Sequence, residues 1–573
     1  MINMGKLRAD ENNFKEGGFI GIAQINPVVG DLEYNSKKVA DYIRHAESLS
    51  LDAVVFPEFA LIGTPFGGIT ERHPFIIAES RKWLNGLAKI TGKTAAIVGF
   101  AENEGISAAA ILRNGRVEKI IKKSDKDRIY TLNGIRYGIS FGAEKADFAD
   151  SDVIINCSAI PFGIDKVAQT AANECKKPVI CANQVGAVDN ISFSGGSVAV
   201  NCDGKIFARA KFFEEDFVVL NPKTGYGRAE KSFEKKEIKE FTLDYDEADL
   251  ERIYKTIVQG TKDYFKKCGL KRAVLGLSGG LDSTVCAVIL TDVLGKDNVF
   301  GVSMPSKLTS DLSKSDAKKL ADNLGIGFAE ASIKPMFDTT SECFGELFKS
   351  VEKRWNDRYE KSFTPDNIQA RSRATYLWGV SNEFPSCIPI ATSDKSEAYM
   401  GYATINGDMS GGFAPIADVT KTQLFALARW LNKYREVKNV IPETVITRKP
   451  GAELAIDPKT GKTLNAEDAL MPYEFLDEII WRIENKGESY QDLLKAEFIY
   501  EKREKISKEQ KTEWLDKFYR RMSSALYKWS IAAPAVIVEP HSINGAVYSQ
   551  PITSGRINYK GSTEEEIISS LQV

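Results

Sequence analysis

The second half of this 573-residue chain is organised by the stretch Arg272-Ala273-Val274-Leu275-Gly276-Leu277-Ser278-Gly279-Gly280-Leu281-Asp282-Ser283-Thr284. An apolar run ends in Ser-Gly-Gly and an amphipathic pattern follows, which predicts a buried strand, a tight loop and a helix. Glycines let the backbone approach a ligand closely, and the first N–H groups of a helix attract anions. The alternative is an ordinary glycine turn, but the hydroxyl groups favour phosphate binding. Asp282 suits a divalent cation that bridges the phosphates.

The loop differs from that of P-loop kinases and GTPases, because it contains no lysine. It resembles the pyrophosphate loop of the N-type ATP pyrophosphatases, which transfer AMP to a substrate and release pyrophosphate. That resemblance indicates the class of reaction and leaves the substrate open.

Composition narrows the class of protein. A chain of 573 residues is expected to hold at least two domains. The formal net charge of −2 argues against a nucleic-acid partner. No apolar run is long enough to cross a bilayer, and no signal sequence is recognisable. The eight cysteines form no CxxC pair, and the chain has only three histidines, so a zinc site is not expected. We expect a soluble, cytoplasmic protein without a membrane partner.

Short apolar segments alternate with helical patterns up to about residue 220, which predicts an α/β sandwich. Residues 221–245 are polar and are interpreted as a linker between a first domain, 1–220, and a second, 246–573. The strand-helix alternation of the second domain predicts a Rossmann-like parallel sheet with ligands at the carboxyl ends of its strands.

Several ordered pieces of the first domain resemble the nitrilase, or carbon-nitrogen hydrolase, fold, an α-β-β-α sandwich. They are Ala23-Gln24, Phe56-Pro57-Glu58, residues 156–162, residues 183–186 and Gly195-Gly196-Ser197. In that superfamily a Glu, a Lys and a Cys split an amide. The resemblance implies that Glu58 is the general base and that Lys122 is the catalytic lysine. Lys123 fits equally well, and an exposed lysine pair without a role remains an alternative.

The nucleophile position departs from that pattern. Where the family has Cys-Glu-Asp after a strand, this chain has Gly142-Ala143-Glu144, and glycine offers no nucleophile. Cys157, Cys175 and Cys181 lie in a strand, a helix and a strand of the predicted fold, where a free cysteine usually serves as a small apolar group. We therefore expect the amidase site to be folded but inactive.

Three further stretches of the second domain point to a substrate. They are Asp366-Asn367-Ile368-Gln369-Ala370-Arg371, Ala391-Thr392-Ser393-Asp394-Lys395-Ser396-Glu397 and Gly407-Asp408-Met409 with its continuation to Lys421. Together with the loop at 276–284 they resemble the NAD⁺ synthetases, in order, over roughly residues 250–540. An amidase domain ahead of this domain is the layout of the glutamine-dependent form.

The resemblance implies ATP-dependent amidation of deamido-NAD⁺ with ammonia, and with ATP and Mg²⁺ as cofactors. It implies a homo-oligomer, and in the long form glutamine supplies the ammonia. The implied ATP ligands are Gly276, Leu277, Ser278, Gly279, Gly280, Leu281, Asp282, Ser283, Thr392 and Lys421. The implied metal ligands are Asp282 and Glu397, and the implied deamido-NAD⁺ ligands are Asn367, Arg371, Asp408 and Lys528.

Because position 142 is glycine, we expect ammonia rather than glutamine to be the nitrogen donor. Three alternatives stay open: a glutamine-hydrolysing enzyme with a displaced nucleophile, another adenylating enzyme of the same superfamily, and a binding module without activity. The intact set of Ser278, Asp282, Thr392, Glu397 and Lys421 argues against the last.

Overall fold

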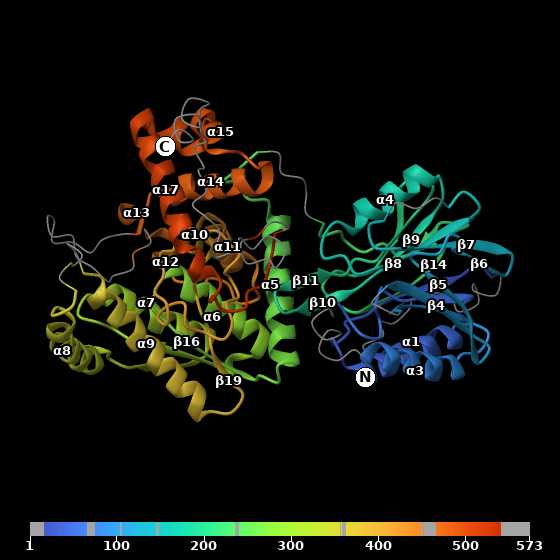
Figure 1. Cartoon of the computed structure of the whole chain (residues 1–573), viewed down its shortest axis with the longest axis horizontal. Helices are drawn as coiled ribbons and strands as arrows, with labels where there is room; N and C mark the ends of the chain where they lie inside the picture. Colours follow the sequence, from blue (N-terminus) through green and yellow to red (C-terminus); the bar gives the residue numbers. More distant parts are fainter. Residues whose placement is uncertain are drawn as a thin grey trace. The chain divides into compact units, whose positions relative to one another are not determined.

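The computed structural model describes residues 17–65, 75–102, 106–144, 148–234, 240–355, 357, 362–448, 451, 466–539 and 542. The chain divides into two compact units, Met1–Lys236 and Glu237–Val573, and each is described by itself (Figure 1). The division falls inside the predicted linker, and a short strand of the first unit, Tyr226–Gly227, also lies in that stretch. Among the described residues, no helix has the length and apolar character needed to cross a membrane.

The first unit contains two β-sheets that pack face to face. The order in the larger sheet is β15-β14-β1-β2-β3-β4-β5, and in the smaller sheet β13-β12-β9-β8-β7-β6. The larger sheet comprises β1 (Ile20–Gln24), β2 (Ala53–Val55), β3 (Ala95–Ala101), β4 (Ser107–Arg113), β5 (Arg116–Lys122), β14 (Asp216–Asn221) and β15 (Tyr226–Gly227). The smaller comprises β6 (Ile129–Leu132), β7 (Ile135–Phe141), β8 (Val153–Ser158), β9 (Val179–Asn183), β12 (Val198–Val200) and β13 (Ile206–Arg209). A hairpin, β10 (Val185–Val188) and β11 (Ile191–Ser194), stands apart.

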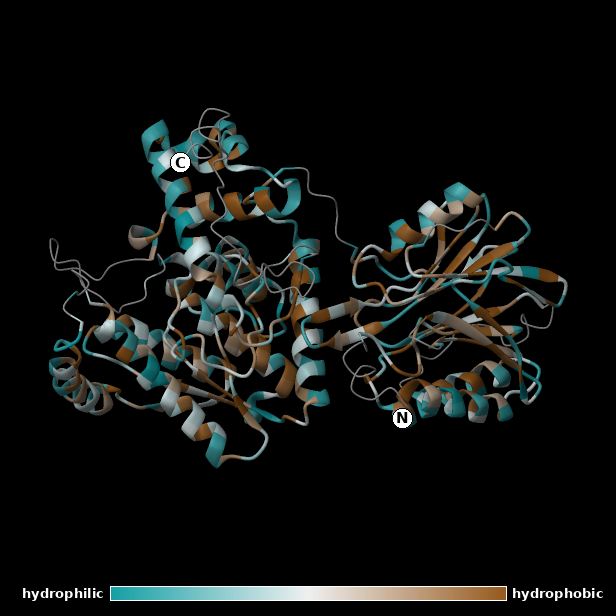
Figure 2. Cartoon of the chain, in the orientation of Figure 1, coloured by the Kyte–Doolittle hydropathy of each residue, from teal (hydrophilic) through white to brown (hydrophobic). Residues whose placement is uncertain are grey.

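Helices cover the outer faces of both sheets. α1 (Leu32–Ser48) and α3 (Phe75–Lys89) pack on the larger sheet, and α4 (Ile164–Cys175) packs on the smaller one (Figure 1). A third apolar core, which includes Ile97, Ile139 and Ile155, fills the space between the sheets. Figure 2 shows this distribution, with apolar residues concentrated on the strands. The predicted α-β-β-α sandwich is confirmed.

The second unit is built around a parallel sheet with the order β18-β17-β16-β19. Its strands are β16 (Arg272–Gly276), β17 (Val299–Ser303), β18 (Gly327–Glu330) and β19 (Cys387–Pro389). The chain passes from β16 to β17 and β18 on one side and then returns to β19 on the other side of β16, so the strand order reverses next to β16. Such a switch point opens a crevice in which ligands bind. The predicted Rossmann-like sheet is confirmed.

Helices of the second unit carry the rest of the chain around this sheet. They are α5 (Glu247–Lys267), α6 (Leu281–Leu294), α7 (Asp311–Leu324), α8 (Lys334–Val351), α9 (Thr364–Glu383), α10 (Lys395–Tyr399), α11 (Lys421–Tyr434) and α12 (Glu443–Thr447). The C-terminal helices α13 (Ala466–Ala469), α14 (Tyr473–Lys486), α15 (Tyr490–Lys495), α16 (Ile499–Glu504) and α17 (Lys508–Trp529) form a separate apolar core. Tyr399 and Met400 insert into that core, which fixes α10 beside the carboxyl end of β19.

Candidate active site

The loop between β16 and α6 has the tight form that its glycines predict. Gly279 has a φ of +77°, and a Cβ atom there would lie 2.2 Å from the Ser313 carbonyl oxygen, so only glycine fits. The Ser278 hydroxyl accepts a hydrogen bond from the Gly280 N–H at 3.1 Å and lies 3.1 Å from the Ser283 hydroxyl. Hydroxyl groups and the first N–H groups of α6 therefore share one small region, which suits a phosphate group.

Two buried leucines hold this loop in place. Leu277 and Leu281 belong to the main apolar core of the unit, so the backbone between them is anchored at both ends. The predicted residues Gly276 to Ser283 thus form one turn, anchored by Leu277 and Leu281, at the carboxyl end of β16.

Lys421 joins three carboxylates at the crevice. Its Nζ lies 2.7 Å from Asp282 Oδ1, 2.7 Å from Asp394 Oδ2 and 3.1 Å from Glu397 Oε1. Asp282 comes from the start of α6, Asp394 and Glu397 from α10, and Lys421 from the start of α11. One oxygen atom from each carboxylate lies within 4.8 Å of the others, as a cation site requires.

Charge and burial in this cluster favour a further cation. Burial raises the pKa of Asp394 and of Glu397, although the nearby Lys421 ammonium acts in the opposite direction. Burial also disfavours the ammonium of Lys421, but the attraction of the carboxylates outweighs it and raises its pKa. Three carboxylates and one ammonium leave two formal negative charges, and oxygen ligands are those that Mg²⁺ prefers.

Backbone contacts fix the geometry of the cluster. Asp394 caps α10, because its Oδ1 accepts a hydrogen bond from the Glu397 N–H at 2.8 Å. The Ser396 hydroxyl accepts from the Lys421 N–H at 2.9 Å and donates to Asp477 of α14 at 2.5 Å. The helices that carry Glu397 and Lys421 are thereby tied to each other and to the C-terminal helices.

The four predicted deamido-NAD⁺ ligands gather around residues 401–408. The Asn367 Oδ1 accepts from the Thr404 hydroxyl at 2.8 Å, and the Arg371 Nε donates to the Ile405 carbonyl at 3.1 Å. Asp408 Oδ1 accepts from the Thr404 N–H at 2.5 Å. The Lys528 ammonium donates to the carbonyl groups of residues 401 and 403 at 2.8 and 2.6 Å. In this structure all four side chains shape that segment.

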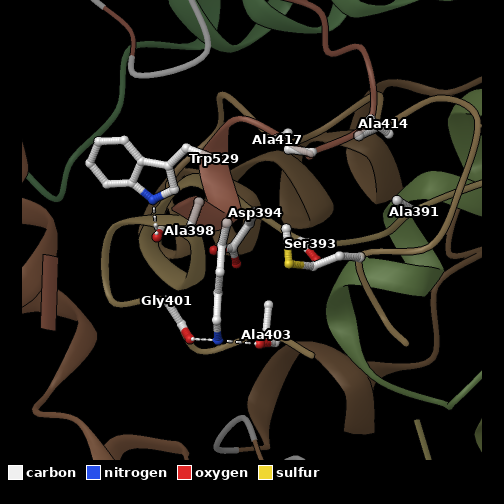
Figure 3. A pocket seen from close by; sticks show the side chains of 13 residues that line it. Ala391, Ser393, Asp394, Ala398, Gly401, Ala403, Ala414, Ala417 and Trp529 are labelled. Carbon is white, nitrogen blue, oxygen red and sulfur yellow. Dashed lines mark hydrogen bonds between the residues drawn. The ribbon is translucent and has the colours of Figure 1, made fainter. Parts of the chain in front are cut away.

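A pocket adjoins the carboxylate cluster (Figure 3). It is partly open to solvent, and Asp394, Ser393 and Lys528 line it together with several alanines. The Trp529 indole N–H donates to the Ala398 carbonyl at 2.9 Å and closes one side. Thr392 immediately precedes Ser393 and is half-buried. The pocket places a small apolar space directly beside the cluster.

The residues that the resemblance assigns to an amidase site lie close together in the first unit. Glu58 follows β2, is only 8 % exposed, and its carboxylate accepts a hydrogen bond from the Ser107 hydroxyl. Burial raises the pKa of the Glu58 carboxyl, although the hydrogen bond from Ser107 and the positive charge of Lys123 act against that rise. Of the two candidate lysines, Lys123 is the one whose charge acts on Glu58. Ile121 faces the core between the sheets, and side chains alternate along a strand, so Lys122 leaves β5 on the other face.

Gly142 is the residue at which the resemblance to the carbon-nitrogen hydrolases places the nucleophile. It follows β7 with a φ of +55°, and a Cβ atom built on it would lie 3.7 Å from Glu58 Oε2. A side chain at position 142 would thus point at the carboxylate that should act as its base. Glycine presents no such group.

The other cysteines of the first unit are poorly placed to replace a nucleophile. Cys157 is buried in the core between the sheets, and Cys181 is buried under α4. Burial raises the pKa of both thiols, so they stay protonated at neutral pH. Cys175 ends α4, and Cys202 is exposed on a turn after β12.

The sequence alone did not identify Asp394 as a member of the cluster or Lys123 as the lysine near Glu58. A signal existed for Asp394, since an Asp three residues before a Glu at a helix start is a capping pattern. The signal for Lys123 was its spacing of two from the apolar Ile121.

Family comparisons cover both units. A family model described as NAD synthase matches residues 253–518, and one described as carbon-nitrogen hydrolase matches residues 148–222. The glutamine-dependent NAD(+) synthetase of Synechocystis sp. is 32% identical over 533 residues, which is 84% of this chain and 90% of that protein. The one from Aquifex aeolicus is 33% identical over 520 residues, which is 80% of this chain and 88% of that protein.

Solved structures agree in fold. A glutamine-dependent NAD(+) synthetase from Cytophaga hutchinsonii superimposes with a TM-score of 0.73 at 20% identity and covers 94% of this chain and 97% of its own. Another from Acinetobacter baumannii, in complex with ADP, gives a TM-score of 0.65 at 24% identity and covers 93% and 99%.

Proposed function

The chain belongs to the family of glutamine-dependent NAD(+) synthetases, and we propose that it converts deamido-NAD⁺ to NAD⁺ with ATP while taking its nitrogen from free ammonia. One observation carries the second part of this proposal: position 142, whose side chain would point at Glu58, is glycine. The buried thiols of Cys157 and Cys181 offer no replacement.

The reaction we propose has two steps. A carboxylate oxygen of deamido-NAD⁺ attacks the α-phosphorus of ATP, and pyrophosphate leaves. Ammonia then attacks the acyl carbon, AMP leaves with the electron pair of the broken C–O bond, and loss of a proton gives the amide. The loop from Gly276 to Ser283 would bind the phosphates, with Thr392 nearby at the end of β19. The Lys421 ammonium would stabilise the charge that develops on the departing pyrophosphate.

The carboxylate cluster fits a magnesium ion. Asp282 and Glu397 would hold it, and Asp394 supplies a third oxygen donor at the distance a shared cation needs. When bound, the ion would draw negative charge from the phosphates of ATP. Lys421 keeps the three carboxylates together in its absence.

The pocket beside the cluster supports the placement of the nicotinate end of deamido-NAD⁺. It lies next to Asp394 and is bounded by the segment that Asn367, Arg371, Asp408 and Lys528 hold. We propose that these four residues act on substrate binding, through direct contacts or through residues 401–408. The homo-oligomer implied by the resemblance is measurable by analytical ultracentrifugation.

The test of this function is NAD⁺ formation from deamido-NAD⁺ and Mg-ATP, with ammonium and with glutamine in parallel. We expect turnover with ammonium and none above background with glutamine. Equal rates with glutamine would refute the loss of amidase chemistry. Absence of NAD⁺ with either donor, together with pyrophosphate release on another acid, would favour a different adenylating enzyme.

A further inference from the structure

The peptide group between Gly279 and Gly280 has its two polar atoms held from opposite sides. The Gly279 carbonyl oxygen accepts a hydrogen bond from Arg448 Nη2 at 2.7 Å. The Gly280 N–H donates to the Ser278 hydroxyl at 3.1 Å. A trans peptide group is planar, so its C=O and N–H point in opposite directions. A contact that fixes the carbonyl therefore also fixes the direction of the N–H.

Arg448 is itself held rigidly. It ends α12, where its N–H donates to the Thr444 carbonyl at 3.1 Å, and its Nη1 donates to the Ser313 hydroxyl of α7 at 3.1 Å. α12 is also tied to α7 by the Thr444 hydroxyl, which donates to Asp316 Oδ1 at 2.6 Å. The guanidinium thus bridges α7 and the loop, and its fork geometry sets the direction of both hydrogen bonds.

The glycine at position 279 puts no side chain in the way of a rotation of this peptide, so the orientation depends on contacts such as the one from Arg448. Glycine adopts positive and negative φ values with similar ease, and this one has a φ of +77°. A rotated peptide would turn the Gly279 carbonyl towards the phosphate region and the Gly280 N–H away from it. An oxygen atom with partial negative charge at that place would repel an anion.

We propose that Arg448 is a positioning residue, which holds the Gly279–Gly280 peptide in the orientation that binds the pyrophosphate part of ATP. This inference rests on the proposed function, since it takes the loop to be the ATP phosphate site. Arg448 acts from behind the loop, through the Gly279 carbonyl. It differs from Lys421, which lies with the carboxylates.

The proposal predicts that the loss of Arg448 affects the binding of ATP and leaves the binding of deamido-NAD⁺ almost unchanged. Loss of one hydrogen bond from a charged donor changes binding by about tenfold or more. In Arg448→Met we expect the KM for ATP to rise about tenfold, and the inhibition constant of pyrophosphate to rise by a similar factor. The KM for deamido-NAD⁺ is expected to stay within about twofold. Arg448→Lys keeps the positive charge but loses the paired N–H donors of the guanidinium, and we expect its KM for ATP to lie between those of the unaltered protein and Arg448→Met.

Thr444→Val is the matched control. It breaks the hydrogen bond between α12 and Asp316 but leaves the guanidinium and the loop untouched. If Arg448 only docks α12 on α7, Thr444→Val would raise the KM for ATP as much as Arg448→Met, and the proposal would be overturned. An unchanged KM for ATP in Arg448→Met would overturn it as well.

The unaltered protein distinguishes this inference from the proposed function. If it forms no NAD⁺ from ATP, deamido-NAD⁺ and ammonium, the proposed function fails. If the unaltered protein is active and Arg448→Met has the same KM for ATP and the same inhibition constant of pyrophosphate, only the positioning role of Arg448 fails. Should Arg448→Met not fold by circular dichroism, the same comparison is made with Arg448→Lys, for which an unchanged KM for ATP and pyrophosphate inhibition constant would overturn the proposal.

Discussion

Replacement of Lys421 by methionine removes the ammonium that three carboxylates share. Lys421 is 1 % exposed and Asp394 is fully buried. Asp282 and Glu397 keep about a fifth to a quarter of their side-chain surface in solvent, at 24% and 19%. Water can therefore solvate these two carboxylates in part, whereas Asp394 depends on Lys421 for its compensation. Methionine keeps the apolar stem and removes only the charge.

Removal of one partner from a buried ion pair costs about 3–5 kcal/mol, because the remaining charge stays buried without compensation. We expect Lys421→Met to lower the free energy of unfolding of the second unit by up to that amount at about pH 9, where Asp394 is ionised in the unaltered protein. Urea unfolding followed by tryptophan fluorescence measures it. The double variant Lys421→Met with Asp394→Asn is expected to recover most of the loss, since it removes the uncompensated charge as well.

The deficit should depend on pH with a defined sign. Burial raises the pKa of Asp394 from 3.8 to about 7 even with the Lys421 ammonium beside it, and loss of Lys421 raises it further. A group with a raised folded pKa destabilises the protein as the pH rises through that value. Below about pH 6 Asp394 is protonated in both folded proteins, so the deficit of Lys421→Met is expected to be small there and to grow as the pH rises from about 7 to 9. A loss below about 1 kcal/mol at about pH 9, or a double variant no more stable there than the single one, would contradict the assigned role of Asp394.

Three further predictions concern the first unit. Gly142→Cys is expected to create measurable glutamine-dependent NAD⁺ formation. It should also lower the free energy of unfolding by about 1–2 kcal/mol, because position 142 has a φ of +55°, which a residue with a Cβ adopts at a cost. Strict ammonium dependence of the variant would argue against the assigned nucleophile position. Burial raises the pKa of Glu58 above 4.5, so the unfolding free energy of the unaltered protein should fall relative to Glu58→Gln as the pH rises from about 4.5, by about 1.4 kcal/mol for each unit by which the pKa is raised. A stability difference that is constant with pH would show that Glu58 has an ordinary pKa. The Cys157 thiol should resist iodoacetamide in the folded protein while the exposed Cys202 reacts, as peptide mass spectrometry would show; rapid labelling of Cys157 would make it a nucleophile candidate.

Local signals in the sequence predicted much of the second unit. The Ser-Gly-Gly turn located β16, the phosphate loop and the start of α6, because each depends on residues that are adjacent in the chain. Gly325 is the C-cap of α7 with a φ of +69°, and a glycine directly after a helical pattern is a local signal for such an end. These features need no knowledge of the tertiary structure.

Features that depend on distant contacts were harder to predict. β5 lies at the edge of its sheet and reads Arg-Val-Glu-Lys-Ile-Ile-Lys, without the strict apolar-polar alternation that marks a half-buried strand. Without the strand, no argument could separate Lys122 from Lys123. The contribution of Asp394 follows from its distance to Asp282 and Lys421, which come from other elements. The hydrogen bonds from Lys528 to the carbonyl groups of residues 401 and 403 could not be predicted either, because these residues are far apart in the sequence.

The ion cluster has a consequence for the order in which a nascent chain can fold. Asp282 and Lys421 are 139 residues apart in the sequence, and Lys421 is synthesised after all three carboxylates. Until α11 has left the ribosome, burial of ionised Asp394 would be unfavourable, because no counter-charge exists. Contacts between distant segments also carry the entropy of closing a long loop. The crevice beside the phosphate loop is therefore expected to close late in synthesis, after the strands on either side have formed.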